Sequence, residues 1–257
     1  MRTYCSRVMM ILALLILKAG FHVVPDAGAS GIPAGFVDVG TFIPGIPLDI
    51  RYHTAHNFIG TPIDGYHAPK CFLTRQAAEA LLHVQEELKP FSLSLKLYDG
   101  YRPQRALDHF VSWSKDAFDT KMKKEFYPFT RKGRLIKEGY IAPRSSHSRG
   151  SAVDVTIVPI PLPPQEEYIE GRELCECHFS VGERFGDNSL DMGTGYDCFH
   201  IFSWTASRRI GPQQRANRLL LKSLMEKHGF VNFEKEWWHF KLKDEPFPDT
   251  YFDFPVE

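Results

Sequence analysis

The sequence feature that constrains this chain most is residues 145–156, S-S-H-S-R-G-S-A-V-D-V-T, in which six residues separate His147 from Asp154. Around Asp154, apolar and polar residues alternate with a period of two, which is typical of a strand with one buried face. Asp154 is therefore expected on the face opposite its valine neighbours. The small residues at 150–152 allow the backbone to approach other segments closely. The pattern predicts a carboxylate on a rigid strand, directly after a tight loop that carries a histidine.

A second cluster far downstream, E-W-W-H at residues 236–239, adds the carboxylate of Glu236 and the imidazole of His239. Two histidines and one carboxylate are a common ligand set for catalytic zinc, which keeps its fourth position open for water. With a further carboxylate as the base for that water, the two clusters hold the inventory of a metal hydrolase. The alternative is that these are ordinary polar loop residues. Because Glu236 and His239 lie three apart, a flat strand would place them on opposite faces, so a turn or bulge is expected within E-W-W-H.

The rest of the chain indicates a mixture of helices and strands without regular alternation. Helices are expected at 76–89, with Thr74 as N-cap, at 104–116, and at 212–228, where Gly229 ends the helix. Strands are expected around 48–52 and 93–97. Another follows the histidine loop and ends near residue 159, and two more are expected at 230–233 and 238–242. The segment up to 139 is expected to be partly helical, and residues 165–200 to be mostly loop. The fold class predicted is α+β, with a mostly antiparallel central sheet flanked by helices in a single domain.

Residues 1–29 are expected to be a secretory signal peptide. Arg2 and Arg7 give a positive start, an unbroken apolar run follows at 8–17, and Ala27-Gly28-Ala29 is an A-x-A cleavage pattern. The apolar run is shorter than the roughly 20 residues that span a bilayer, although an uncleaved anchor is the alternative. We therefore expect an exported protein, periplasmic or else secreted, whose catalytic domain is residues 30–257. No stable membrane association is expected after cleavage.

The charges of the chain are balanced, with 31 basic and 31 acidic residues. Nothing in this balance favours nucleic acid or an anionic membrane surface as a partner. The sequence leaves the oligomeric state open.

Four cysteines follow the cleavage pattern: Cys71, Cys175, Cys177 and Cys198. An even number in an exported protein indicates disulfides, with three possible connectivities. Cys175 and Cys177 are too close in sequence to bond each other easily, so each is expected to reach one of the other two. The alternative is a metal site built from the C-x-C pair and His178, but thiols in an oxidising compartment tend to pair.

Four short motifs occur in a fixed order along the chain, and together they resemble a known family. They are D-G-Y-R-P at 99–103, S-x-H-x(6)-D at 145–154, D-M-G-T at 191–194 and E-W-W-H at 236–239. The set is similar to the zinc D-alanyl-D-alanine dipeptidases of the vancomycin-resistance type, within the wider group of D,D-peptidases and hedgehog-like metallopeptidases. The resemblance extends from about residue 35 to residue 252, except for residues 161–187, which include C-E-C and do not match.

The resemblance implies a role for each of these residues. It implies that His147, Asp154 and His239 bind one zinc ion per chain, that Glu236 is the general base, and that Arg102 polarises the scissile carbonyl. A fixed positive charge suits the oxyanion that forms during peptide hydrolysis. Alternatively, Arg102 only pairs with Asp99.

Three further residues are candidates for contacts with the substrate. Asp191 and Asp197 could each hold a substrate ammonium group, and the residues do not decide between them. Ser145 could contact the substrate or only cap its own loop.

The function that the resemblance implies is zinc-dependent hydrolysis of D-alanyl-D-alanine to two D-alanines, with a small dipeptide as the partner. A D,D-carboxypeptidase that trims the terminal D-alanine from peptidoglycan stem peptides is the second hypothesis, and it would need an open cleft. A non-catalytic zinc-binding module is the third, and it would be expected to lack Glu236 or Arg102. A free dipeptide carries both an ammonium and a carboxylate group, so a dipeptidase is expected to have a small, closed pocket.

Overall fold

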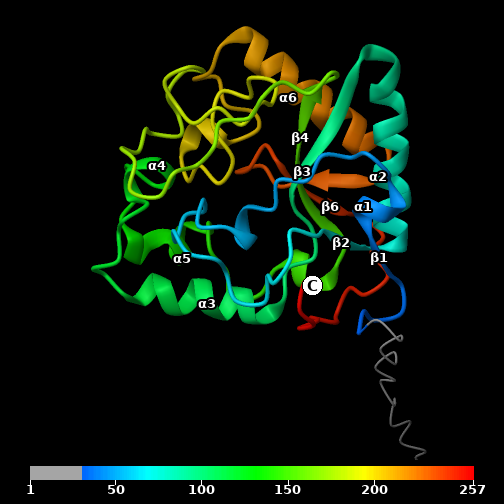
Figure 1. Cartoon of the computed structure of the whole chain (residues 1–257), viewed down its shortest axis with the longest axis horizontal. Helices are drawn as coiled ribbons and strands as arrows, with labels where there is room; N and C mark the ends of the chain where they lie inside the picture. The colour runs from blue at the N-terminus through cyan, green and yellow to red at the C-terminus, as the bar shows by residue number, and fades with distance from the viewer. Residues whose placement is uncertain (1–30) are drawn as a thin grey trace, which may run out of the picture.

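A four-stranded antiparallel sheet lies at the centre of residues 31–257, the part of the chain that the computed structural model describes (Figure 1). Its strands, in spatial order, are β3 (Leu93–Asp99), β4 (Ala152–Pro159), β6 (His239–Leu242) and β5 (Phe230–Asn232). A small second sheet pairs β1 (Phe36–Asp38) with β2 (Phe72–Thr74). The prediction of an α+β fold with an antiparallel central sheet is confirmed. The predicted signal peptide, residues 1–29, lies outside the described residues.

Helices lie on both sides of this sheet (Figure 1). On one side are α2 (Arg75–Leu88) and α6 (Pro212–Lys227), and on the other are α3 (Gln104–Lys115), α4 (Lys123–Phe126) and α5 (Leu135–Glu138). The shorter helical turns are α1 (Val39–Phe42), η1 (Arg51–His53), η2 (Lys89–Phe91), η3 (Lys132–Arg134), η4 (Ser146–Arg149) and η5 (Ile201–Ser203). The three long helices, α2, α3 and α6, lie where the sequence predicts them.

Helix α2 forms because its apolar residues recur on one stripe, and this stripe is fully buried at Ala77, Leu81, Val84 and Leu88. Thr74 occupies the N-cap position, as predicted, but its hydroxyl does not cap the helix. It forms a hydrogen bond with Ser151 Oγ at 2.8 Å instead, and so joins the helix start to the loop before β4.

Strand β4 is buried more completely than its alternating pattern predicts. Its residues 152–158 are all buried, polar and apolar alike. The face that carries Asp154 is covered by the long segment 160–200, whose Tyr196 hydroxyl donates a hydrogen bond to Asp154 Oδ2 at 3.0 Å. Asp154 and Thr156, the polar residues of β4, are therefore enclosed by other parts of the chain and do not face bulk water.

The strand predicted around 48–52 does not form, and this prediction is wrong. The backbone pairs with β3 only at Leu48, which forms an isolated bridge to Leu97, and then turns into η1. Pro47 has no N–H to extend the pairing. The Arg51 side chain returns to Asp49 Oδ2 at 2.8 Å, which favours the turn over a continued strand.

Residues 160–200 contain no helix and no strand, in agreement with the predicted loop. One disulfide, Cys177–Cys198, connects this segment to itself. Cys71 and Cys175 are free, so the expectation that both residues of the C-x-C form disulfides is wrong for Cys175. Cys71 is buried against Gly100 at the end of β3, and its environment is the apolar core.

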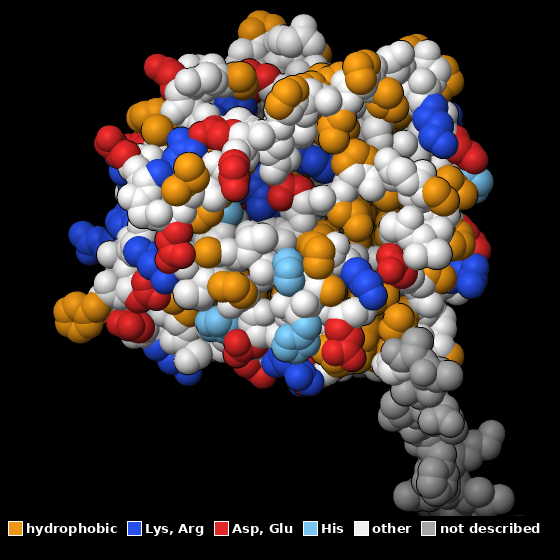
Figure 2. Space-filling model, in the orientation of Figure 1, with side chains coloured by type: hydrophobic (Ala, Val, Ile, Leu, Met, Phe, Trp, Pro, Cys, Tyr) orange, Lys and Arg blue, Asp and Glu red, His pale blue; other side chains and the backbone are white. Residues whose placement is uncertain are grey.

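Within residues 31–257, none of the helices combines the length and the apolar character needed to cross a membrane. On the face shown in Figure 2, acidic and basic side chains are interspersed and do not gather into a continuous patch of one sign. This distribution agrees with the balanced charge of the sequence.

Candidate active site

The register of the central sheet places three polar side chains in one row. Asp99 pairs with Asp154 across β3 and β4, and Asp154 pairs with His239 across β4 and β6. The β3–β4 register shifts between Leu97 and Asp99, and such a bulge re-aims the side chain that follows it. Residues far apart in the sequence thus meet at one end of the sheet.

The loop before β4 brings His147 to the same place. This residue lies in η4, which is capped by the Ser145 hydroxyl accepting from the His147 N–H at 3.3 Å. Gly150 ends the turn with φ +79°, a conformation that favours glycine, and a side chain there would collide with the Phe36 ring. The small residues predicted to allow a close approach therefore do so. His147 is fully buried as a result.

The tautomer of His147 is fixed by the backbone. Its Nδ1 lies 2.6 Å from the carbonyl oxygen of Gly100, to which it donates a hydrogen bond. The lone pair is therefore left on Nε2, which faces Asp154 and His239. A carbonyl that orients a histidine in this way is a typical support for a metal ligand.

Three donor atoms converge on one point, with His147 Nε2 and His239 Nδ1 3.0 Å apart. Asp154 Oδ1 lies 3.0 Å from His239 Nδ1 and 3.3 Å from His147 Nε2. Donor atoms around a tetrahedral zinc ion, with bonds of about 2.0–2.1 Å, lie about 3.3 Å apart. The spacing and the donor types fit a zinc site, and among the described residues this is the one cluster of three such side chains that could hold a metal.

Electrostatics favour the ligand form of Asp154. Burial raises the pKa of its carboxyl, but the combined effect of His147 and His239 lowers it by more. The resulting pKa lies well below the usual range. The carboxylate is therefore ionised, as a metal ligand must be.

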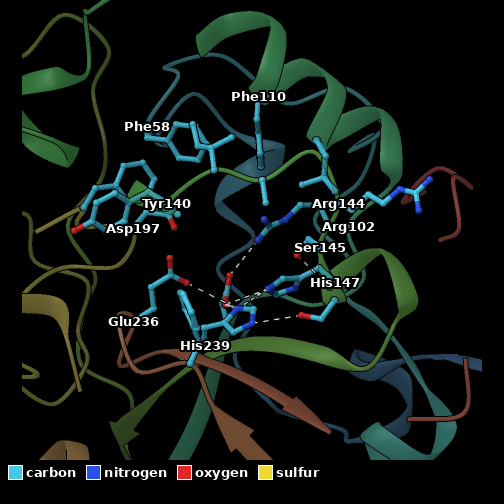
Figure 3. A pocket seen from close by; sticks show the side chains of 18 of the residues that line it. Phe58, Arg102, Phe110, Tyr140, Arg144, Ser145, His147, Asp197, Glu236 and His239 are labelled. Carbon is cyan, nitrogen blue, oxygen red and sulfur yellow. Dashed lines mark hydrogen bonds and ion pairs between the residues drawn. The ribbon is translucent and has the colours of Figure 1, made fainter. Parts of the chain in front are cut away.

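Glu236 lies beside this cluster without joining it. The predicted turn within E-W-W-H is present, because the His239 N–H bonds to the Glu236 carbonyl at 3.2 Å before β6 begins. The turn places Glu236 Oε2 3.9 Å from His239 Nδ1, on the pocket side of the metal ligands (Figure 3). Burial, with the nearby carboxylates of Asp154 and Asp197, raises the pKa of Glu236 well above its usual range. A cation bound by the three ligands would act in the opposite direction.

Arg102 points into the pocket from the loop after β3 (Figure 3). Its Nε donates to Asp99 Oδ2 at 2.9 Å and its Nη2 to Asp154 Oδ2 at 3.2 Å. The guanidinium also lies over the Tyr52 ring, 4.8 Å from its centroid. Arg102 therefore does pair with Asp99, as the alternative expected. The pair does not withdraw the guanidinium from the pocket, because Arg102 remains part of the pocket lining.

The pocket that these residues line is small, with a volume of about 230 Å³. Ligand pockets for drug-sized molecules are typically about 300–1,000 Å³. Aromatic and aliphatic side chains, including Phe58, Phe110 and Tyr140, form the wall opposite the metal ligands (Figure 3). Such a pocket admits a short ligand with small side chains.

The structure distinguishes the two candidate aspartates. Asp197 lines the pocket and accepts a hydrogen bond from Tyr52 at 2.8 Å. Burial, together with Asp154, raises the pKa of Asp197 to about 8. Asp191 lies outside the pocket lining, where Arg184 and Gln214 bind its carboxylate at 2.8 and 2.7 Å. Asp191 therefore supports the fold of the D-M-G-T turn, and only Asp197 is available to a ligand.

Ser145 both caps η4 and lines the pocket, so the two interpretations of this residue are compatible. Sequence reasoning missed several residues of the site. Tyr52 donates a hydrogen bond to Asp197, and Tyr196 donates one to Asp154. Phe58 and Phe110 belong to the apolar wall of the pocket. The one available signal was the position of Tyr196 next to Asp197, because no spacing rule connects Tyr52 to a residue 145 positions away.

Comparisons with known proteins agree with this geometry. A family model described as D-ala-D-ala dipeptidase matches residues 33–159 and 179–257. The chain belongs to the D-ala-D-ala dipeptidase family. The resemblance stated from four motifs is thereby confirmed. The four-motif resemblance did not extend to residues 161–187, and the family model likewise leaves out residues 160–178.

Four curated relatives carry the name D-alanyl-D-alanine dipeptidase, and two of them show the extent of the match. The one from Streptomyces coelicolor is 38% identical, over 86% of this chain and 98% of its own. The one from Enterococcus faecalis is 36% identical, again over 86% of this chain and 98% of its own. Among solved structures, the LD-carboxypeptidase LdcB covers 82% of this chain and 70% of its own at 16% identity and a TM-score of 0.40. By its family the chain is a metallopeptidase, and it aligns with these two dipeptidases over nearly their whole length.

Proposed function

We propose that this protein hydrolyses free D-alanyl-D-alanine to two D-alanines, with one zinc ion per chain held by His147, Asp154 and His239. The observation that carries the proposal is the convergence of these three donors with Glu236, Arg102 and Asp197 in a single small pocket. When bound, zinc supplies a Lewis acid and lowers the pKa of a water molecule to about 7.

Glu236 is the residue placed to move protons. Its carboxylate lies beside the ligands but outside their set, so it is free to accept a proton from the attacking water. It then returns the proton to the amine that leaves, as a general base and acid in turn. The raised pKa of Glu236 favours the first of these transfers, because a buried carboxylate is a stronger base than an exposed one.

Arg102 supplies fixed positive charge to the oxygen of the scissile carbonyl. Its guanidinium is held by Asp99 and Asp154, which limits its movement. A donor that is already oriented stabilises developing negative charge without reorganisation during the reaction.

Asp197 gives the site its preference for a free dipeptide. Its carboxylate forms no ion pair with any of the described residues, since Arg102 is paired with Asp99 and Asp154. A substrate ammonium group would provide the missing cation and lower the pKa of Asp197, so that the pair binds as two charges. An N-acylated substrate has no such cation and needs space beyond the small pocket. These features favour the dipeptidase over a carboxypeptidase with an open cleft.

We further propose that the protein is exported. The signal-peptide pattern in residues 1–29 supports export, most simply to the periplasm, where D-alanyl-D-alanine would come from outside the cytoplasm. This location favours wall turnover or nutrient scavenging over antibiotic resistance. If deletion of the protein leaves growth on external D-alanyl-D-alanine unchanged, that purpose is wrong.

The test of the activity is an assay of the purified, zinc-loaded protein on D-alanyl-D-alanine and on its N-acetyl derivative. We expect release of D-alanine from the free dipeptide and little or none from the acylated one. Equal rates on both would favour the carboxypeptidase, and no hydrolysis of either would favour a non-catalytic zinc module.

A further inference from the structure

The disulfide Cys177–Cys198 is attached to the lining of the pocket, because Cys198 lies between Asp197 and Phe199, which both line it. Cys198 is fully buried and immediately follows Tyr196 and Asp197 in the chain. The Tyr196 hydroxyl donates to Asp154, one of the metal ligands, at 3.0 Å, and Asp197 accepts from Tyr52 at 2.8 Å. The covalent bond is therefore attached one residue from the side chain that faces the substrate.

Asp197 has a backbone conformation that needs support. Its φ of +54° lies in the left-handed region, which is uncommon for residues other than glycine but is adopted by aspartate more readily than by most. No helix or strand supplies this support, since residues 160–200 contain neither. The constraints nearby are the disulfide, the hydrogen bonds of the Tyr196 and Asp197 side chains given above, and backbone hydrogen bonds such as Gly195 N–H to the Cys177 carbonyl at 2.8 Å.

Cys177 is itself attached to a rigid part of the molecule. Its N–H bonds to the carbonyl of Glu125 in α4 at 3.0 Å, and the Glu125 carboxylate binds His56 Nε2 at 2.8 Å. The His56 ring stacks on Tyr168, with centroids 4.3 Å apart, which fixes the preceding part of the loop as well. Cys177 also lies in residues 160–178, outside the match to the family model.

We propose that the Cys177–Cys198 disulfide is a positioning device for the substrate pocket: it holds Asp197 where the carboxylate meets the ammonium group of a free dipeptide. This inference rests on the proposed function. The segment that does not match the family model would then contribute to substrate specificity through Cys177. This role of the disulfide is distinct from general stabilisation of the fold.

The test is a double variant, Cys177→Ser with Cys198→Ser, compared with Cys175→Ser. The control removes a free cysteine two residues from Cys177 and leaves the disulfide intact. For each protein, the zinc content, the melting temperature, kcat and KM for D-alanyl-D-alanine are measured well below the melting transition. We expect KM to rise about tenfold in the double variant, because part of a charge-assisted contact is lost. KM of the control is expected to stay unchanged.

A double-mutant cycle with Asp197→Asn shows whether the effect passes through this carboxylate. When Asp197→Asn is already present, loss of the disulfide is expected to leave KM nearly unchanged. An equal rise in KM in both backgrounds would overturn the proposal, and so would a double variant that melts earlier but keeps the wild-type KM.

If the double variant does not fold, the native protein is reduced with a water-soluble phosphine and its thiols are counted. In that reaction the phosphine takes the oxygen of a water molecule and the two sulfurs take its protons. A KM that rises on reduction and recovers on reoxidation supports the proposal, while a constant KM in protein with a reduced disulfide overturns it. Failure of the proposed function would look different, because the wild-type protein would then show no dipeptidase activity at all.

Discussion

Replacing Glu236 by glutamine separates the base from the metal ligands. The substitution keeps the size of the side chain and removes its charge and its ability to accept a proton. Glu236 Oε2 is 3.9 Å from His239 Nδ1 and does not belong to the three converging donors, so the variant is expected to keep its zinc. Loss of a positioned general base typically lowers the rate about 10²–10⁴-fold, which corresponds to about 3–5 kcal/mol in the activation barrier.

The assay is zinc content and turnover on the same Glu236→Gln sample. Glu234→Gln is the matched control, because Glu234 is an exposed carboxylate two residues upstream that does not line the pocket. The control is expected to keep both zinc and activity. A Glu236→Gln protein that is depleted of metal, and whose activity returns with added zinc, would make Glu236 a support for His239, and the base would have to be another residue. Loss of a residue that only orients a metal ligand typically costs about 10–100-fold in metal affinity or activity.

Three further predictions use the same protein preparations. Alanine at any one of the three proposed ligands is expected to remove most of the zinc, as metal analysis would show, and full zinc in any two of these variants would contradict the site. Arg102→Lys is expected to keep its zinc and lose about 10²–10³ in kcat, because the oriented guanidinium is lost, and an unchanged kcat would limit Arg102 to its contacts with Asp99 and Asp154. Thiol titration of unfolded, unreduced mature protein is expected to find two free thiols, Cys71 and Cys175. Four free thiols would show that the disulfide does not form.

The local arrangement around the candidate metal ligands was predictable from the sequence because it depends on residue types and local spacing. The H-x(6)-D pattern predicts a histidine loop that enters a strand, and the structure confirms both η4 and β4. The requirement for a turn within E-W-W-H follows from the two-residue period of strands, and the turn is present. The long amphipathic helices were predictable for the same reason, since the stripe of α2 is a local pattern.

What the sequence could not supply depends on contacts between distant segments. Asp191 and Asp197 lie in the same loop and look alike in one dimension. They differ because Arg184 and Gln214 donate hydrogen bonds to the carboxylate of Asp191, whereas Asp197 faces the pocket beside Tyr52. The even number of cysteines likewise suggested two disulfides, and only the three-dimensional arrangement leaves Cys71 and Cys175 unpaired.

The strand expected around 48–52 illustrates a different limit. Its composition favours an extended segment, and the backbone does pair with β3 at Leu48. The ion pair between Arg51 and Asp49 and the start of η1 then end the pairing after one residue. A side-chain contact and a turn within the segment itself therefore outweighed its preference for an extended strand.

The most direct test of the account is a titration of metal-free protein with zinc, while release of D-alanine from D-alanyl-D-alanine is followed. We expect no turnover without metal, a linear rise in rate with added zinc, and a plateau at one zinc per chain. Full activity in the metal-free protein, or no activity once one zinc is bound, would contradict it.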